Sequence, residues 1–350
     1  MTRVLAADAM CGPGPLLPGW VAVGGDGTIV EVGAGAVPRG AETVTGVLAP
    51  GFVDLQVNGH DDVGFATAEL DDLHRATEAL ARSGTTTFCP TVVSHDLTSY
   101  EGLLPRLDGI GHGIHLEGPF LGDAPGAHDR GFLRTLDPRA LDALLTLVDR
   151  HPVAVVTIAP EADPGLAGVR ALSDRGVLVA LGHTTSTYET ALAAADAGAR
   201  AVTHLFNAMG AFHHRAPGLV GAALDDPRLT PTLIADLVHV HPAALRLAIA
   251  AKPRSALVSD AVARGASRGP NGMLAGSEIT LADAVCNVVA LGVPLDRAVA
   301  MASTIPCEML GLIDRGRIEA GRRADLVVLD PDTARLYRTY QRGVEITSRS

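Results

Sequence analysis

The stretch FVDLQVN (residues 52–58) decides the fold, because it is the first of eight β-rich runs that recur along the chain. It follows a Pro-Gly turn and is apolar except for Asp54, Gln56 and Asn58, which stand at every second position. On a β-strand these three side chains share one face. Strands that are buried on both faces do not ordinarily carry polar residues at this spacing, so the three residues are candidates for a specific role.

Seven similar runs follow, and helical patterns fill most of the gaps between them. The further runs are TTTFCPTVV (85–93), GIHLEGPF (113–120), VAVVTIAPE (153–161), VLVALGHTT (177–185), AVTHLFNAM (201–209), TPTLIADLVHV (230–240) and SALVSDAV (255–262). The helical patterns span 70–84, 138–151 after Asp137, 187–199 with Ser186 or Thr187 as the cap, and 241–252. Strands that alternate with helices predict a parallel sheet, and eight of them predict an α/β fold of the (β/α)8 TIM-barrel type.

The two ends of the chain have a different character. Residues 1–48 include GWVAVGGDGTIVEVGAG, and the C-terminal part includes ADLVVLDPDTARLYRTYQRGVEI. Both segments show short alternating strands separated by turns. We therefore expect residues 1–48 and 318–350 to form a small β-sandwich domain together, and residues 49–317 to form the catalytic barrel.

Composition limits the class of protein. The 350 residues are 47% hydrophobic and carry a net charge of −11, which disfavours a nucleic-acid-binding protein because such a protein needs a basic face. The four cysteines form no CxxC pair. The N-terminus lacks the apolar core of a secretory signal, and we find no apolar run long enough to span a membrane. We expect a cytoplasmic protein with no membrane partner.

Polar residues recur at the predicted carboxyl ends of the strands, where barrel enzymes hold their active sites. The candidates are His115 and Glu117 in the third run, His183 in the fifth, His204 in the sixth and Asp260 in the eighth. The seventh run also ends in polar residues, Asp236, His239 and His241. Each alone could be a hydrogen-bonded core residue or a helix cap. Several at one end of four strands indicate a site, and two His with one Glu suffice for a catalytic zinc that keeps one position open for water.

The motifs around these residues come in a fixed order and cover nearly the whole chain. They are PGFVDLQVNG, GTTTFCPT, HLEGPFL, GAHD, TIAPE, LGHTT, THLFNAM, HHRAPGLVGAAL, IADLVHVHP, LVSDA, LAGS and GRRADLVVLD. In these motifs the sequence resembles the N-acetylglucosamine-6-phosphate deacetylase family of the amidohydrolase superfamily. The resemblance implies an enzyme that hydrolyses the acetamide of N-acetylglucosamine 6-phosphate to glucosamine 6-phosphate and acetate.

The resemblance also implies the roles of the central residues. Glu117, His183 and His204 match the metal ligands of the family, and a metal-bound water attacks the acetamide carbonyl. Asp260 matches the catalytic residue that acts first as general base and then as general acid. His239, in the IADLVHV motif, matches a histidine that contacts the substrate and could polarise its carbonyl.

Further residues match positions that bind the substrate in the family. Asn207, the backbone of Ala208 and Arg215 match contacts to the phosphate, for which the forked guanidinium of arginine is suited. His128, in the GAHD motif, matches a histidine on the substrate side. Some contacts in the family cross a dimer interface, so the resemblance implies a homodimer in which Arg215 serves its own or the neighbouring subunit.

The same resemblance suggests a role for Gln56 and Asn58, two of the polar residues of the first run. Most amidohydrolases carry His-x-His on the first strand for a second metal, whereas this chain has Gln56 and Asn58. Neutral amides are poor zinc ligands beside imidazole. We therefore expect one divalent metal ion per subunit, Zn²⁺ as the first candidate, with Gln56 and Asn58 hydrogen-bonding near the substrate in the space of the missing ion.

Two features depart from the family pattern and bear on the substrate. The segment VARGASRGPNGM (262–273) has twelve residues where the family usually has a longer hairpin. Pro125 and Gly126 precede Ala127 where the family often has a lysine. The same machinery could therefore act on another N-acyl sugar or on an N-acyl amino acid, and a catalytically silent sugar-phosphate-binding protein is a third reading.

Overall fold

The computed structural model describes residues 2–12, 16–269 and 272–347. These residues group into two compact units. One unit comprises the described parts of Met1–Asp54, Glu78–Thr87 and Ile279–Ser350, and the other comprises Leu55–Thr77 and Phe88–Glu278. The domain boundaries expected from the sequence, 1–48 with 318–350 against 49–317, stay a prediction.

An eight-stranded sheet contains every β-rich run of the sequence, in chain order. Its strands are β5 (Phe52–Val57), β8 (Thr85–Val92), β9 (Ile114–Glu117), β10 (Val153–Ile158), β11 (Leu178–Leu181), β12 (Ala201–Val202), β13 (Thr230–Ile234) and β14 (Ala256–Val258). The neighbours from β8 to β14 pair in parallel, and their residues are almost all buried, as expected for a sheet covered on both faces. The predicted (β/α)8 barrel is confirmed.

The barrel closes between its first and last strands, just past their carboxyl ends. Val57 and Ala261 form a parallel bridge. The backbone N–H of Asn58 donates to the carbonyl of Ala261 at 2.7 Å, and the N–H of Asp260 donates to the carbonyl of Gln56 at 3.0 Å. The closing contacts therefore involve the residues that the sequence singles out on the first and eighth strands.

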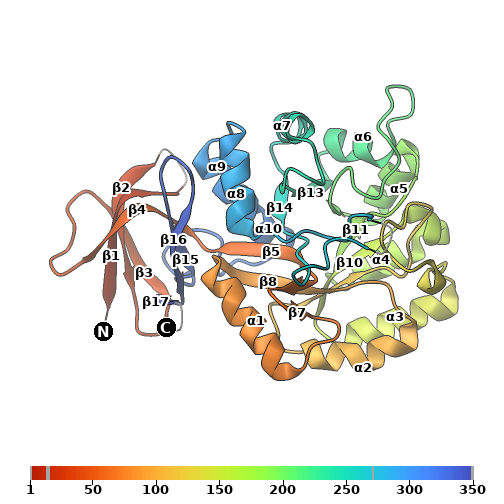
Figure 1. Cartoon of the computed structure of the whole chain (residues 1–350), viewed down its shortest axis with the longest axis horizontal. Coiled ribbons are helices and arrows are strands. Elements are labelled where there is room, and N and C mark those ends of the chain that lie inside the picture. Colours follow the sequence, from red (N-terminus) through yellow and green to blue (C-terminus); the bar gives the residue numbers. More distant parts are fainter. Residues whose placement is uncertain (1, 13–15, 270–271, 348–350) are drawn as a thin grey trace. The chain divides into compact units, whose positions relative to one another are not determined.

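One helix of the barrel series follows each of the eight strands (Figure 1). These helices are α1 (Leu70–Arg82), α2 (Leu97–Leu107), α3 (Pro138–Arg150), α4 (Ala167–Ser173), α5 (Tyr188–Ala197), α6 (Gly218–Asp225), α7 (Pro242–Ala251) and α8 (Leu281–Ala290). Two further helices, α9 (Leu295–Ala302) and α10 (Thr304–Met309), complete the chain's helical part, and 3₁₀ turns occur at Arg130–Phe132, Pro160–Ala162 and Pro164–Leu166. Among the described residues, no helix has the length and apolar character needed to cross a membrane.

The predicted helix starts are confirmed by their caps. Asp137 accepts hydrogen bonds from the backbone N–H groups of Arg139 and Ala140, each at 2.9 Å, and so begins α3. Thr187, rather than Ser186, caps α5. This helix ends at Gly198, whose φ of 123° is a conformation that favours glycine.

The observed strands are all shorter than the predicted runs, and the difference is largest for two of them. The run 201–209 is a strand only at Ala201–Val202, and the run 230–240 ends its strand at Ile234. The physical reason is that His204 and Leu237 adopt left-handed backbone conformations, with φ of 30° and 64°, which a strand cannot contain. The polar ends of both runs are therefore loops beyond the sheet edge.

A seven-stranded sheet is built from both ends of the chain, drawn in red to orange and in blue in Figure 1. Its order is β17 (Val344–Glu345), β16 (Leu336–Gln341), β15 (Leu326–Leu329), β4 (Glu42–Pro50), β1 (Arg3–Met10), β2 (Leu17–Val23) and β3 (Ile29–Ala34). A buried cluster that includes Leu5, Val21, Leu48, Leu326 and Tyr340 forms its core. The expectation that the two ends combine in one β-rich region is confirmed. A short hairpin, β6 (Gly59–His60) with β7 (Val63–Gly64), follows β5.

Candidate active site

A cavity of about 800 Å³ lies within the unit formed by Leu55–Thr77 and Phe88–Glu278. Its lining includes Asn58, Glu117, His183, His204 and Asp260, which come from the carboxyl ends of five strands. Most of the remaining wall is apolar, and among the described residues no lysine or arginine lines it. The size falls in the usual range for pockets that bind small molecules.

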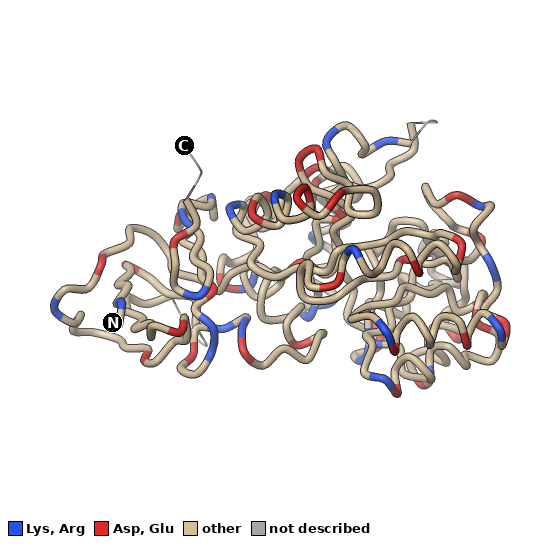
Figure 2. Tube along the Cα trace, turned by 90° about the horizontal axis from the view of Figure 1, so that it is seen from below, with Lys and Arg blue, Asp and Glu red and all other residues tan. Residues whose placement is uncertain are grey.

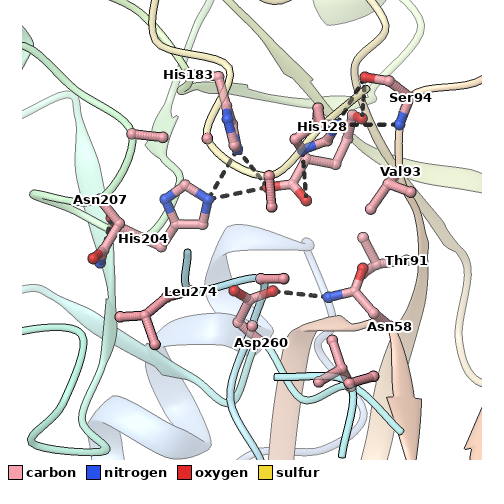
Figure 3. A pocket seen from close by; sticks show the side chains of 18 of the residues that line it. Asn58, Thr91, Val93, Ser94, His128, His183, His204, Asn207, Asp260 and Leu274 are labelled. Atoms are coloured by element: carbon pink, nitrogen blue, oxygen red, sulfur yellow. Dashed lines mark hydrogen bonds and ion pairs between the residues drawn. The ribbon is translucent and has the colours of Figure 1, made fainter. Parts of the chain in front are cut away.

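Glu117, His183 and His204 converge on one point of this cavity. The Nε2 atoms of His183 and His204 lie 3.0 Å and 3.1 Å from the same carboxylate oxygen, Oε1 of Glu117. The two Nε2 atoms are 3.1 Å apart. In Figure 3 the two rings point into the same space, and all three residues are at least 96% buried.

The donor atoms of this cluster fit a divalent cation. Nδ1 of His183 lies 3.0 Å from the carbonyl oxygen of Pro125, which can only accept, so Nδ1 carries the proton. Nε2 of the neutral ring then directs a lone pair at a carboxylate oxygen that also only accepts. A positive ion between these atoms would relieve the repulsion, and the outer hydrogen bond to Pro125 is the usual means of orienting a metal-binding imidazole.

The Glu117 carboxylate is held in its charged form despite its burial. Burial acts to raise the pKa of Glu117, but the neighbouring imidazoles of His128, His183 and His204 outweigh it and hold the pKa well below the ordinary value. A metal ligand must be deprotonated, so this environment prepares Glu117 for coordination.

In Figure 3 Asp260 faces this cluster across the cavity and is contacted by the amide of Asn58. The amide of Gln56 also holds it. The Nδ2 of Asn58 donates to Oδ1 of Asp260 at 2.8 Å, and the Nε2 of Gln56 donates to the same oxygen at 3.1 Å. Gln56 also donates to Oε1 of Glu117 at 2.8 Å. The amide of Gln56 thus links the two carboxylates, and the amide of Asn58 holds Asp260. The expectation that they fill the space of a second ion stays a prediction.

His128 lies beside the carboxylate of Glu117. Its Nε2 is 3.6 Å from Oε2 of Glu117, and its Nδ1 is 2.8 Å from Oγ of Ser94. The backbone N–H of Ser94 also donates to Nδ1, at 3.3 Å, which leaves the Nε2 side of the ring toward Glu117. His128 therefore lines the cavity, as a residue on the substrate side must, and it contacts the cluster as well.

His239 also lines the cavity, and its ring contacts Asp236, which lies toward the end of the run 230–240 and to which the sequence alone assigns no role. Ser94 is a second residue that sequence reasoning missed. The spacing Asp-x-x-His at a strand end is a signal that could have pointed to Asp236, because aspartate side chains accept hydrogen bonds from residues two and three positions on. No local signal joins Ser94 to His128, since 34 positions separate them.

The predicted phosphate contacts divide into two groups. Asn207 and Ala208 line the cavity. Arg215 does not line it: its side chain is exposed and contacts the ring of the adjacent His214, with Nη1 and Nε2 at 2.9 Å. Phe212 in the same loop is 57% exposed. Within one chain, therefore, the cavity and Arg215 are separate.

His115 belongs to the core and not to the cavity. Its ring lies between the carbonyl of Leu55, at 2.9 Å, and the hydroxyl of Thr157, at 2.8 Å. Burial lowers the pKa of His115 to about 4. His115 shares a strand face with Glu117 but lies two residues nearer the start of the strand, about 6–7 Å deeper in the barrel.

Left-handed backbone conformations concentrate where the functional residues stand. Non-glycine residues with positive φ follow each of the last four barrel strands: His183, His204, Phe206, Ala208, Leu237 and Asp260. Each such residue costs about 1–3 kcal/mol unless the surroundings enforce it, and strained residues of this kind cluster at functional sites. Four of these residues, His183, His204, Ala208 and Asp260, line the cavity, so the strain coincides with the placement of functional residues.

The chain is similar to known proteins over nearly its whole length. A sequence model described as the amidohydrolase family matches residues 47–348. N-acetylglucosamine-6-phosphate deacetylase from Mus musculus is 37% identical over 340 residues, covering 85% of this chain and 82% of that protein. N-acetylgalactosamine-6-phosphate deacetylase from Escherichia coli is 36% identical over 316 residues, covering 81% and 84%.

A solved structure shows the same likeness in three dimensions. It is a mutant of N-acetyl-D-glucosamine-6-phosphate deacetylase from Mycobacterium smegmatis in complex with N-acetyl-D-glucosamine-6-phosphate. It matches with a TM-score of 0.91 and 34% sequence identity, covering 99% of this chain and all of that chain. The similarity therefore includes both the barrel and the sheet built from the chain ends.

Proposed function

This chain belongs to the amidohydrolase family, and within it to the N-acetylglucosamine-6-phosphate deacetylases, and on this premise we propose that it converts N-acetylglucosamine 6-phosphate and water into glucosamine 6-phosphate and acetate. The observation that carries the proposal is the convergence of Glu117, His183 and His204 in one cavity that Asp260 also lines. These are the residue types that amide hydrolysis needs: a cation site and a carboxylate that can move a proton.

We assign Glu117, His183 and His204 as the ligands of one divalent ion per chain, with zinc as the first candidate. One carboxylate and two imidazoles are a common protein ligand set of catalytic zinc. Such an ion, when bound, lowers the pKa of water and polarises a carbonyl oxygen. Gln56 and Asn58 occupy the strand-one positions where a second ion would need imidazoles, and they donate hydrogen bonds there instead.

Asp260 is the general base and then the general acid of the proposed reaction. Its Oδ1 accepts hydrogen bonds from Asn58 and Gln56, which orient the carboxylate that takes a proton from the attacking water. As the C–N bond breaks, the same proton passes from Asp260 to the nitrogen of the departing amine. The balance closes, because water gives one proton to the amine through Asp260 and gives its oxygen with the second proton to acetic acid, which then ionises to acetate.

His239 and His128 are assigned to the substrate. Both line the cavity, and each has one ring nitrogen held by the protein, Nδ1 in both cases. Nε2 of His239 is then the ring nitrogen that faces the substrate. Nε2 of His128 stands beside Glu117 and limits where the sugar ring can lie.

We assign the phosphate to Asn207, the backbone of Ala208 and Arg215. The cavity lining offers a phosphate dianion no lysine or arginine among the described residues, whereas Arg215 stands exposed on a loop after β12 beside Phe212. A homodimer in which this loop enters the neighbouring cavity would supply the missing cation. The phosphate assignment therefore includes a dimer as part of the proposal.

The galactosamine epimer is a second candidate substrate. The relative from Escherichia coli named for N-acetylgalactosamine 6-phosphate is 36% identical to this chain, close to the 37% of the relative named for the glucosamine compound. The two sugars differ only in the orientation of one hydroxyl group. The proposed chemistry at the acetamide is the same for both, so the distinction rests on the sugar-binding residues.

The charge distribution is consistent with a small-molecule substrate. Lys and Arg positions are interspersed with Asp and Glu positions along the described trace (Figure 2), and the net charge is −11. Nucleic-acid binding would need a concentrated basic surface. A cytoplasmic location remains part of the proposal.

An acetate-release assay tests the proposed function. The purified chain would be offered the 6-phosphates of N-acetylglucosamine and N-acetylgalactosamine, the unphosphorylated sugars and an N-acetyl amino acid. Release from a phosphorylated amino sugar in preference to the others is the expected result. Binding of the sugar phosphate without any acetate release, in protein that carries its metal, would instead identify a silent binding protein.

A further inference from the structure

The contact between Asp236 and His239 is shorter than any other hydrogen bond to a ring nitrogen of the cavity histidines. Oδ2 of Asp236 lies 2.7 Å from Nδ1 of His239, and the two side chains are only 8% and 6% exposed. The other oxygen, Oδ1, accepts the backbone N–H groups of Val238 at 2.9 Å and of His239 at 2.8 Å. Oδ2 of Asp236 thus contacts the His239 ring, and Oδ1 binds the backbone of the following turn.

The turn between the two residues is strained and therefore enforced by its surroundings. Leu237 has a φ of 64°, a left-handed conformation that is costly for a residue with a branched side chain. The two backbone hydrogen bonds to Asp236 hold this turn closed. As a result the ring of His239 is attached to the end of β13 in one orientation, at the wall of the cavity.

The chemistry of the pair fixes where the proton of the ring lies. Burial acts to raise the pKa of Asp236, but the hydrogen bonds from the His239 ring and from the two backbone groups bring the pKa below its ordinary value. An ionised carboxylate can only accept, so Nδ1 of His239 must donate. Nε2 is then the nitrogen left for a ligand, and in the neutral ring it carries the lone pair.

We propose that Asp236 is a positioning residue of the active site, which locks His239 in the tautomer protonated at Nδ1 and so presents Nε2 to the substrate. The role of His239 in turnover rests on the proposed function, whereas the tautomer is a property of the protein by itself. The ring nitrogen that faces a substrate is set by the hydrogen bond of the other nitrogen, so the loss of Asp236 changes what His239 offers.

Asp236→Asn tests this role without dismantling the turn. The amide oxygen of asparagine can replace Oδ1 as the acceptor of the two backbone N–H groups. The amide nitrogen then takes the place of Oδ2 and donates to Nδ1 of His239. Nδ1 of His239 can accept this hydrogen bond only if it carries no proton. The proton of the neutral ring must therefore lie on Nε2, so the tautomer is reversed.

Nitrogen-15 spectra of the histidine side chains measure the tautomer directly, with His239→Gln identifying the signal. In the wild-type protein, at a pH where the ring is neutral, we expect His239 to carry its proton on Nδ1; in the Asp236→Asn variant we expect it on Nε2. A wild-type ring protonated on Nε2, or a tautomer that the substitution leaves unchanged, would overturn the proposal. The wild-type spectrum decides even if the variant proves unstable.

Kinetics test whether the tautomer matters for turnover. Asp236→Asn should lower kcat/KM by about 10–100-fold, the range seen when the hydrogen-bond partner of a metal-bound imidazole is lost. It should add no further loss in the His239→Gln background. Asp108→Asn is the matched control, because Asp108 also contacts a histidine ring, that of His151 at 3.2 Å, but away from the cavity.

The spectra and the kinetics can contradict the two proposals separately. Absence of deacetylation by the wild-type protein would refute the proposed function and leave the spectra to decide on the tautomer. Wild-type kinetics in Asp236→Asn, or an equal loss in Asp108→Asn, would show that Asp236 does not position His239 for the reaction.

Discussion

Asp260→Asn removes the base of the proposed reaction while it leaves the hydrogen bonds around the base in place. Oδ1 of Asp260 accepts the amides of Asn58 and Gln56. The oxygen of asparagine can accept both, and this orientation places the amide nitrogen where Oδ2 stood. A nitrogen that only donates cannot take a proton from water, so the substitution changes the chemistry and little else.

The size of the effect follows from the proton that Asp260 moves. General acid–base groups contribute about 10²–10⁴-fold in rate. This range corresponds to about 2.7–5.4 kcal/mol of activation free energy, at about 1.36 kcal/mol for each factor of ten. We expect kcat of Asp260→Asn to fall within this range, and the metal content to stay at the wild-type level because Glu117, His183 and His204 are untouched.

Asp260→Ala is the matched variant that separates chemistry from structure. It removes both oxygens, so the Nδ2 group of Asn58 loses its acceptor at 2.8 Å in a largely buried place. A buried donor left without a partner costs about 1–3 kcal/mol. Asp260→Ala should therefore be about 1–3 kcal/mol less stable than Asp260→Asn, with an activity that is at least as low.

Acetate release gives the rates, elemental analysis gives the metal content, and denaturant unfolding gives the two stabilities. A kcat of Asp260→Asn within tenfold of wild type, in protein with normal metal content, would refute the reasoning. Loss of the metal in this variant would also refute it, because Asp260 would then be a ligand rather than a base.

Three further predictions concern the metal, the phosphate and the thiols. Protein purified without added metal should carry about one divalent ion per chain, since one set of ligands is present; His183→Ala should lose the ion and Gln56→Ala should keep it, and elemental analysis that finds two ions, both required for turnover, would contradict this. Arg215→Ala should cost about 2–5 kcal/mol in kcat/KM on the phosphorylated sugar and little on the unphosphorylated one; equal losses on both would make Arg215 a structural residue. Burial raises the pKa of Cys11 and of Cys307 to about 12, so few thiolates exist and both should resist a disulfide reagent near pH ~8 until the protein is unfolded; rapid labelling of either cysteine in the native protein would contradict this.

The barrel could be predicted from the sequence because each strand is a short apolar run, bounded by turn residues and followed by a helical pattern. The lengths of the strands could not. The runs 201–209 and 230–240 remain partly apolar beyond Val202 and Ile234, yet the backbone there turns left-handed to present side chains to the cavity. Strand propensity describes the local preference of these residues, whereas the active site requires a left-handed backbone conformation that opposes this preference.

The candidate ligands could also be predicted, because the ends of parallel strands meet at one edge and collect their polar residues there. His115 shows the limit of this argument: it alternates correctly with Glu117, but depth within the barrel decides which of the two reaches the cavity. Contacts between loops, such as that of Ser94 with His128, depend on tertiary packing that no local pattern encodes.

The closure of the barrel has a consequence for how the enzyme would lose activity on heating. Asp260 and Asn58 stand on opposite sides of the junction between β5 and β14, which is joined by the bridge between Val57 and Ala261. Local openings of a protein cost less free energy than global unfolding, and a barrel can open where few backbone bonds join its strands. A local opening at this junction would separate Asp260 from the amide of Asn58 while the helices were still folded. On heating, enzymatic activity should therefore be lost at a lower temperature than the helical circular-dichroism signal. The difference between the two midpoint temperatures would measure the stability of this junction relative to that of the helices.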